Sequence, residues 1–221
     1  MIKKMFLLFF AVSIVLHAQG ALDEMVNPKE LIPDIVIDLR YSSADHQFRN
    51  LPNGNILLPK MYTANECLML LKAVNMLKIA QDSLRNIRVH NGVSYPQGIG
   101  IKIWDGYRPR AVQYLLFAVF PNPVYVADPT SGSKHNRGGA IDLTLIDLAT
   151  GQELEMPTLF DDFSDKAAQT YNYLTPTVLA NRQLLRSVMS QVAGFSLYDS
   201  EWWHYEIPGA SGYPLLDFQM K

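Results

Sequence analysis

The sequence predicts a single α+β domain whose largely antiparallel central sheet is flanked by helices. Segments with strand and helix patterns follow one another without the regular spacing of βαβ units, which argues against an all-parallel sheet. Hydrophobic residues form 48% and aromatic residues 11% of the 221-residue chain, which is enough for one packed core. No linker divides the chain convincingly, so we expect one domain.

The first half of the chain contains two predicted strands and the strongest predicted helix. Residues 34–39 have the apolar content of a short strand. Thr63 and Glu66 have the spacing of a capping box, which predicts a helix that begins after Thr63 and continues to about Arg85. Residues 100–104 alternate in the manner of a strand.

A second helix and a long loop are expected next. Pro109 suits the first residue of a helix, because its fixed φ is already helical and its missing N–H is not needed there. This helix should continue through 111–120. Several prolines then mark a long loop over 121–133, and long loops in compact domains are often functional.

The last third of the chain is expected to contain two strands around one helix. Residues 140–146 alternate and read as a central strand. A helix should start at Thr175-Pro176 and end at Gly194, since glycine is favoured just after a helix. Residues 202–207 have the pattern of a final strand.

The first twenty residues have the anatomy of a secretory signal peptide. Lys3 and Lys4 precede the twelve-residue apolar stretch 5–16, and small residues flank a cleavage position before Ala21. We therefore expect a signal peptide over 1–20, a mature domain over 21–221, and export to the periplasm or beyond, without a stable membrane anchor. An uncleaved N-terminal anchor is the alternative.

Charge and cysteine content exclude several classes of protein. Lys and Arg number 19 against 21 Asp and Glu, and no run of five basic residues occurs, so we expect no nucleic-acid partner. No apolar run reaches 18 residues, which excludes a polytopic membrane protein. Cys67 is the only cysteine, so no intramolecular disulfide can form and a metal could assist the core. Nothing in the sequence predicts an oligomeric state.

Two segments place ionisable residues in unusual surroundings. His135 comes just before the strand 140–146, and Asp142 lies inside it on the face opposite the apolar side chains. An acidic residue in such a strand is costly to bury unless it is paired or binds a cation. Gly138 and Gly139 leave room for the backbone to bring His135 back towards Asp142.

The second segment carries Glu201 and His204 at the start of the final strand. If the strand ran unbroken from Glu201, the two side chains would point to opposite faces, because strand side chains alternate. Both can serve one site only if Glu201 belongs to the preceding turn.

Two histidines and one aspartate match a catalytic zinc site with three protein ligands and an open fourth position. A nearby carboxylate that is not a ligand can then act as the general base. From the residues alone other interpretations stay open. The histidines can be ordinary strand residues, Asp142 can form a salt bridge, and Glu201 can be a solvated charge.

Motifs along most of the mature chain resemble those of one peptidase family. The motifs are Ser133-x-His135-x-x-Gly138-x-Ala140-x-Asp142, Glu201-x-x-His204, Asp38-Leu-Arg-Tyr41, Asp105-Gly-Tyr107-Arg108-Pro109 and Gly194-Phe195. Together they resemble the zinc D-alanyl-D-alanine dipeptidases of the VanX type. These belong to the D,D-peptidases that share a fold with the hedgehog signalling domain, and the resemblance implies that fold here.

The resemblance also implies the metal set and the catalytic groups. By it, His135, Asp142 and His204 bind one Zn²⁺ per chain. Glu201 would be the general base, and Arg108 would stabilise the oxyanion of the tetrahedral intermediate.

Further residues are implied to contact the substrate. Asp161 resembles the carboxylate that holds the substrate's ammonium group, and Tyr41 and Ser133 resemble additional contacts. The sequence departs from the family at Pro157, where the family usually has glycine. Because proline fixes φ and removes a donor, the loop can differ, and Asp162 is the alternative to Asp161.

We therefore expect an exported zinc dipeptidase that hydrolyses the small D,D-dipeptide D-Ala-D-Ala. One alternative keeps the chemistry but changes the substrate: a D,D-carboxypeptidase or endopeptidase that acts on longer peptidoglycan peptides. Another is a non-catalytic peptidoglycan-binding module on the same scaffold, which the complete set of site residues disfavours.

Overall fold

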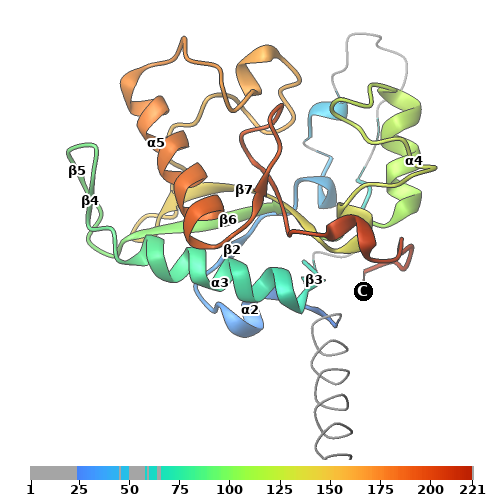
Figure 1. Ribbon diagram of the computed structural model, residues 1–221, viewed down its shortest axis with the longest axis horizontal. Coiled ribbons are helices and arrows are strands. Elements are labelled where there is room, and N and C mark those ends of the chain that lie inside the picture. The colour runs from blue at the N-terminus through green and yellow to red at the C-terminus, as the bar shows by residue number, and fades with distance from the viewer. Residues whose placement is uncertain (1–23, 45, 50–57, 59, 64–65, 221) are drawn as a thin grey trace, which may run out of the picture.

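The computed structural model describes residues 24–44, 46–49, 58, 60–63 and 66–220 (Figure 1). The predicted signal peptide, residues 1–20, lies outside the described residues. Within those residues, none of the helices is long and apolar enough to cross a membrane.

A five-stranded sheet forms the centre of the fold and confirms the predicted α+β class with a mostly antiparallel sheet. Its strands, in spatial order, are β2 (Val36–Ile37), β6 (Ile99–Asp105), β7 (Ala140–Asp147), β9 (His204–Glu206) and β8 (Ser196–Leu197). Only the β2–β6 pair is parallel. The two long strands, β6 and β7, are buried almost throughout and form the middle of the core.

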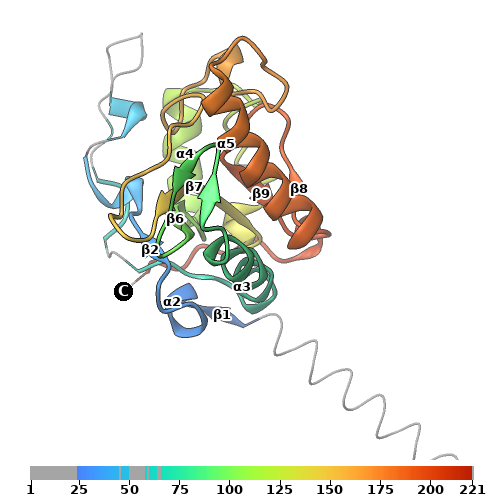
Figure 2. The ribbon, with the colours of Figure 1, turned by 90° about the vertical axis from the view of Figure 1, so that its left-hand side faces the viewer.

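Among the described residues, two small ribbons and four α-helices accompany the central sheet. The ribbons pair β1 (Met25–Val26) with β3 (Met69–Leu70), and β4 (Val89–His90) with β5 (Val93–Ser94). The helices are α2 (Pro28–Leu31), α3 (Leu71–Arg85), α4 (Arg110–Val119) and α5 (Pro176–Ser187). In Figure 1, α4 lies on the opposite side of the view from α5, and Figure 2 shows α3 beneath the end of α5.

Helix α3 begins seven residues later than the capping box predicts. Thr63 does not cap it. Its hydroxyl donates to the carbonyl of Met220 (3.2 Å), and residues 66–70 lead to Leu71 as a non-helical segment that ends in β3. That segment is held by tertiary contacts, since Leu68 accepts a hydrogen bond from the backbone of Tyr107 and β3 pairs with β1. These contacts satisfy backbone groups that the predicted first turns would have used, so the local signal is overridden.

The other predicted elements are present with different ends. Thr175 caps α5 as expected, but the α-helix ends at Ser187 and continues as a π-helical turn, η5 (Val188–Val192). Gly194 follows with a φ of +83°, the left-handed conformation that glycine adopts without a Cβ clash. Pro109 precedes the first helical residue of α4 as its N-cap.

Two features of the core position the site. The pairing of β6 with β7 shifts by one residue between Ile103 and Asp105, a β-bulge that places an extra residue opposite β7. Cys67 is buried with 1% exposure, and its sulfur lies 3.0 Å from where a Cβ on Gly106 would sit. The segment that leads to Arg108 is therefore packed closely on the strand that precedes α3.

Candidate active site

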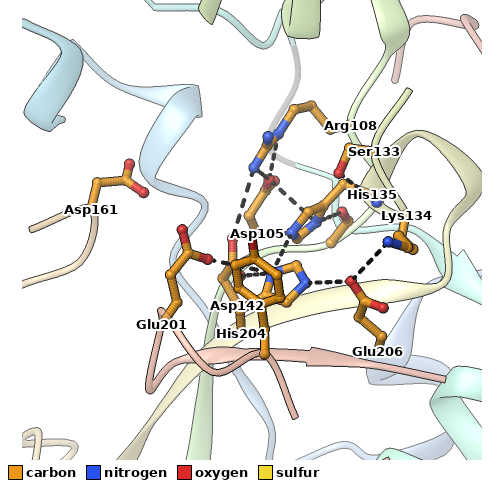
Figure 3. A network of polar contacts seen from close by, with 12 residues as sticks. Asp105, Arg108, Ser133, Lys134, His135, Asp142, Asp161, Glu201, His204 and Glu206 are labelled. Atoms are coloured by element: carbon orange, nitrogen blue, oxygen red, sulfur yellow. Dashed lines mark hydrogen bonds and ion pairs between the residues drawn. The ribbon is translucent and has the colours of Figure 1, made fainter. Parts of the chain in front are cut away.

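Three side chains from separate elements converge on one face of the sheet (Figure 3). Asp142 on β7 and His204 on β9 are cross-strand partners, so both side chains leave the same face. His135 lies in the short 3₁₀ helix η3 (His135–Arg137), which ends at Gly138 with a φ of +65°. That left-handed turn brings the chain back into β7, so the glycine predicted to allow this reversal does so.

The ligand atoms of these residues lie within 4.8 Å of one another. His204 Nδ1 lies 2.9 Å from an Asp142 oxygen, and His135 Nε2 lies 3.3 Å from the other oxygen. The two ring nitrogens, His135 Nε2 and His204 Nδ1, are 3.2 Å apart. All three residues are buried.

The outer hydrogen bonds of the two histidines fix which nitrogens can bind a metal. His135 Nδ1 lies 2.7 Å from the carbonyl oxygen of Gly106, which can only accept, so this nitrogen carries the proton. His204 Nε2 likewise faces the carboxylate of Glu206 at 3.1 Å. Once the inner nitrogens carry no proton, the two rings present lone pairs to each other and to a carboxylate, an arrangement that a cation satisfies. One Asp oxygen and two imidazole nitrogens fit a zinc-type metal ion.

Glu201 lies in the turn before β9, as the shared site requires. Its carboxylate is 3.8 Å from His204 Nδ1, and the residue is 6% exposed. Burial raises the pKa of Glu201 well above its usual value, although His204 opposes the shift. A carboxyl group with a raised pKa beside a metal site can both accept and return a proton.

Arg108 is held in one orientation at the upper side of the site. Its guanidinium donates to Asp105 at 2.8 and 2.9 Å and to Gln113 at 3.0 Å, and one nitrogen lies 3.8 Å from Asp142. Asp105 also accepts a hydrogen bond from Tyr62 (2.6 Å). With its orientation set by these partners, the cation can act on an anion that develops near the metal ligands.

The residues predicted to contact substrate also line this pocket, which has a volume of about 150 Å³. Asp161 is 7% exposed and accepts a hydrogen bond from the hydroxyl of Tyr41 (2.7 Å). Ser133 lies beside His135, whose backbone N–H donates to the Ser133 hydroxyl. Asp162 instead accepts from the backbone of Ser164 and does not line the pocket. Of the two candidates, Asp161 is the one that faces the site.

Comparison with known proteins identifies the family. The family model described as D-ala-D-ala dipeptidase, Peptidase M15, matches residues 22–220. The chain belongs to this family. A D-alanyl-D-alanine dipeptidase of Escherichia coli strain K12 is 34% identical over 198 residues, which cover 90% of this chain and 92% of the relative. One from Enterococcus faecium is 37% identical over 149 residues, 57% of this chain and 71% of the relative.

M15 peptidases are metalloenzymes, and the His–Asp–His cluster of this chain could hold a metal ion. Three polar residues of the site escaped the sequence reasoning as residues with a role. Gln113 lies in α4, five residues after Arg108, and no local pattern marks it. Asp105 stands three residues before Arg108. Glu206 follows His204 by two residues on one strand, and this spacing alone could have placed both on the same face.

Metal binding by this M15 peptidase should release a proton. Burial lowers the pKa of His204, but without a metal ion its hydrogen bonds to Asp142 and Glu206 outweigh burial and raise it to about 10. The ring is therefore protonated at neutral pH and must lose the proton to bind metal. We expect apparent metal affinity to rise about tenfold per pH unit from neutrality towards pH 10. Competition with a chromophoric chelator, repeated across this pH range, measures the apparent metal affinity. An affinity that does not change with pH would contradict the prediction.

Glu206 should tune the metal site without touching the metal. It accepts from His204 Nε2 and also lies 3.6 Å from the ammonium group of Lys134. Glu206→Gln removes the charge that orients and polarises the ring, so metal affinity should fall by about 10–100-fold. Glu30→Gln, at an exposed position on α2, is the matched control and should bind metal as the native protein does. Equal affinities of the two variants would count against this role.

Proposed function

We propose that this chain is a zinc-dependent dipeptidase that hydrolyses D-Ala-D-Ala. The observation that carries the proposal is that a metal-ligand set and two further buried carboxylates, Glu201 and Asp161, line one small pocket. Membership of the M15 family and the names of its relatives support the substrate. The leader-like sequence of residues 1–20 supports export, so the dipeptidase would act in the periplasm or outside the cell.

His135, Asp142 and His204 would hold the zinc ion. When bound there, zinc supplies Lewis-acid chemistry that polarises the scissile carbonyl and makes water more acidic. Glu201 takes the proton from the attacking water onto its carboxylate and later delivers it to the leaving amine. The raised pKa of this buried carboxyl suits both transfers, because a general base works best when its pKa lies near the working pH.

Arg108 would face the oxyanion that forms on the substrate carbonyl. Asp105 and Gln113 hold its guanidinium in place before the substrate arrives, so little reorganisation is needed when the charge develops. The hydrogen bonds to Asp105 leave N–H donors of Arg108 available for the oxyanion, because a guanidinium group has five N–H donors.

Asp161 would hold the free ammonium group of the dipeptide. Burial raises the pKa of Asp161 to about 8, in spite of its hydrogen bond from Tyr41, so the pocket holds a carboxyl group that lacks a cationic partner. An ammonium group supplies that partner. The pocket volume of about 150 Å³ is below the roughly 300–1,000 Å³ of sites for drug-sized ligands, which favours a dipeptide over the longer peptides of a carboxypeptidase.

The deciding experiment joins metal analysis to a substrate panel. The purified protein is expected to contain one zinc per chain, to hydrolyse D-Ala-D-Ala, and to lose activity with a chelator and regain it with zinc. L-Ala-L-Ala should be a poor substrate. Zinc-loaded protein that binds D-Ala-D-Ala without cleaving it would leave the non-catalytic alternative standing.

Arg108→Ala should lower kcat by about 10²–10³-fold, the loss seen when one oxyanion donor is removed. Arg108→Lys should recover little, because a point charge does not reproduce the planar fork that Asp105 and Gln113 hold. Steady-state kinetics on D-Ala-D-Ala separates kcat from KM. A change confined to KM would mean that Arg108 binds substrate and transition state equally.

A further inference from the structure

A second cavity lies on the other side of the wall that carries Asp161. It has a volume of about 510 Å³ and is lined by Arg40, Trp104, Thr144, Glu155 and Phe160, among others. Phe160 lines this cavity while the next residue, Asp161, lines the active-site pocket. Asp161 has a φ of +57°, and this turn lets two consecutive residues face different cavities.

Strand alternation in β6 and β7 brings a tryptophan to this cavity, because Lys102 pairs with Thr144 and Trp104 follows Lys102 by two residues. Thr144 follows Asp142 by two residues on β7, so both side chains leave the same face of the sheet. Trp104 is the extra residue of the bulge, beside Asp105, which pairs with Asp142 in the register. Asp105 contacts Arg108 in the first site, whereas Trp104 packs on Phe160 with ring centroids 5.2 Å apart.

Three of the residues that line the cavity carry a buried hydrogen-bond donor that has no partner among the described residues. The donors are Trp104 Nε1, Thr144 Oγ1 and Arg40 Nε. Trp104 is only 3% exposed and Thr144 is fully buried. Native proteins rarely leave buried donors unpaired, since each costs free energy, so such a group requires a reason. The nearby indole of Trp202 obeys this rule by donating to Thr158 (2.9 Å).

The charges around the cavity indicate the kind of molecule that would pair these donors. Arg40 contributes a guanidinium that lies over the Trp104 ring at 5.4 Å. Its Nη2 is already ion-paired with Asp38 (3.2 Å) and with Glu153 (3.1 Å), which also lines the cavity, so Nε is the donor that stays unpaired. A carboxylate accepts from several donors at once and suits a guanidinium. Glu155 is exposed and forms no ion pair among the described residues, so it can receive an ammonium group.

We propose that this cavity is a second binding site, for an amino-acid zwitterion. The carboxylate of the ligand accepts hydrogen bonds from Trp104, Thr144 and Arg40, and its ammonium group faces Glu155. Binding there needs no turnover at the first site, so it can be tested whether or not the proposed dipeptidase activity holds.

The test follows the indole N–H signal of Trp104 by ¹⁵N NMR in the zinc-loaded protein. The chain has three tryptophans, and Trp104→Phe identifies the signal by its disappearance. D-alanine should shift this signal saturably. D-alanine methyl ester, which lacks the carboxylate, should not. The D-alanine shift should persist in Asp161→Asn, which removes the carboxylate of the first site.

Two variants test which side chains bind the carboxylate and the ammonium group of the ligand. Thr144→Val should weaken D-alanine binding about tenfold or more, as expected for one hydrogen bond to a charged group. The Tm of the ligand-free protein should not fall, because the variant exchanges an unpaired hydroxyl for a methyl group of similar size. Glu155→Gln should weaken binding of D-alanine but not of acetate. Thr177→Val, exposed on α5, is the matched control and should change neither.

Three results would overturn the proposal. One is the absence of a saturable shift with D-alanine, which would mean that the cavity holds water only. Another is an equal shift with the methyl ester, which would exclude carboxylate recognition. The third is a lower Tm of ligand-free Thr144→Val, which would mean that the hydroxyl already has a partner in the folded protein.

Discussion

Exchange of one metal ligand is expected to abolish zinc binding and activity together, whereas Glu201→Gln should lower activity without loss of zinc. His204→Ala removes one of three ligand atoms that lie within 4.8 Å of one another, so the site can no longer hold the ion. Glu201→Gln keeps the shape of the side chain and the ligand set but cannot take a proton. Its kcat should fall by about 10²–10⁴-fold, the usual contribution of a general base.

Zinc content by atomic emission and kcat on D-Ala-D-Ala, measured on the same preparations, check this prediction. His90→Ala is the matched control for loss of a histidine, since His90 pairs with Asn181 away from the site and should leave both quantities unchanged. Zinc loss in Glu201→Gln, with retention in His204→Ala, would reverse the assignment of ligand and base.

Acylation of the substrate's amine should cost most of the activity. N-acetyl-D-Ala-D-Ala has no ammonium group and adds bulk where Asp161 lies. The acylated substrate loses the ion pair with Asp161 and must place its acyl group there, so kcat/KM should fall by about 10²–10³-fold or more relative to the free dipeptide. The burial that raises the pKa of Asp161 to about 8 is the physical basis of this loss.

Asp161→Asn should reduce the difference in kcat/KM between the free and the acylated dipeptide, mainly by lowering turnover of the free dipeptide. Asp162→Asn is the matched control, because Asp162 caps a turn through Ser164 and does not line the pocket. Equal rates on free and acylated substrates with the native protein would favour the D,D-carboxypeptidase over the dipeptidase.

The convergence of the ligands could be predicted because it depends on short-range rules. Strand alternation puts Asp142 on the polar face of β7, a glycine permits the turn after His135, and Glu201 must precede β9 to share a site with His204. Residue spacing did not indicate that Arg108 and Asp161 belong to the site. The resemblance of the motifs to a known family did.

What the sequence could not predict depends on contacts between distant segments. The capping box at Thr63 is a valid local signal, yet the pairing of β3 with β1 decides where α3 begins. The bulge in β6 has no signature in its sequence, because it arises from the register with β7. Both the Asp105 support of Arg108 and the second cavity beside Trp104 depend on that register.

Cys67 has a kinetic consequence. Burial raises the pKa of its thiol, and the sulfur is packed against Gly106, so a thiol reagent in solution meets no reactive thiolate in the folded protein. The reagent can react only after the segment before α3 has separated from the one that leads to Arg108. Because the chain has a single cysteine, each labelling event records one such separation. Labelling rates therefore measure the free energy of separating these two segments directly, in the unmodified protein and without an introduced probe.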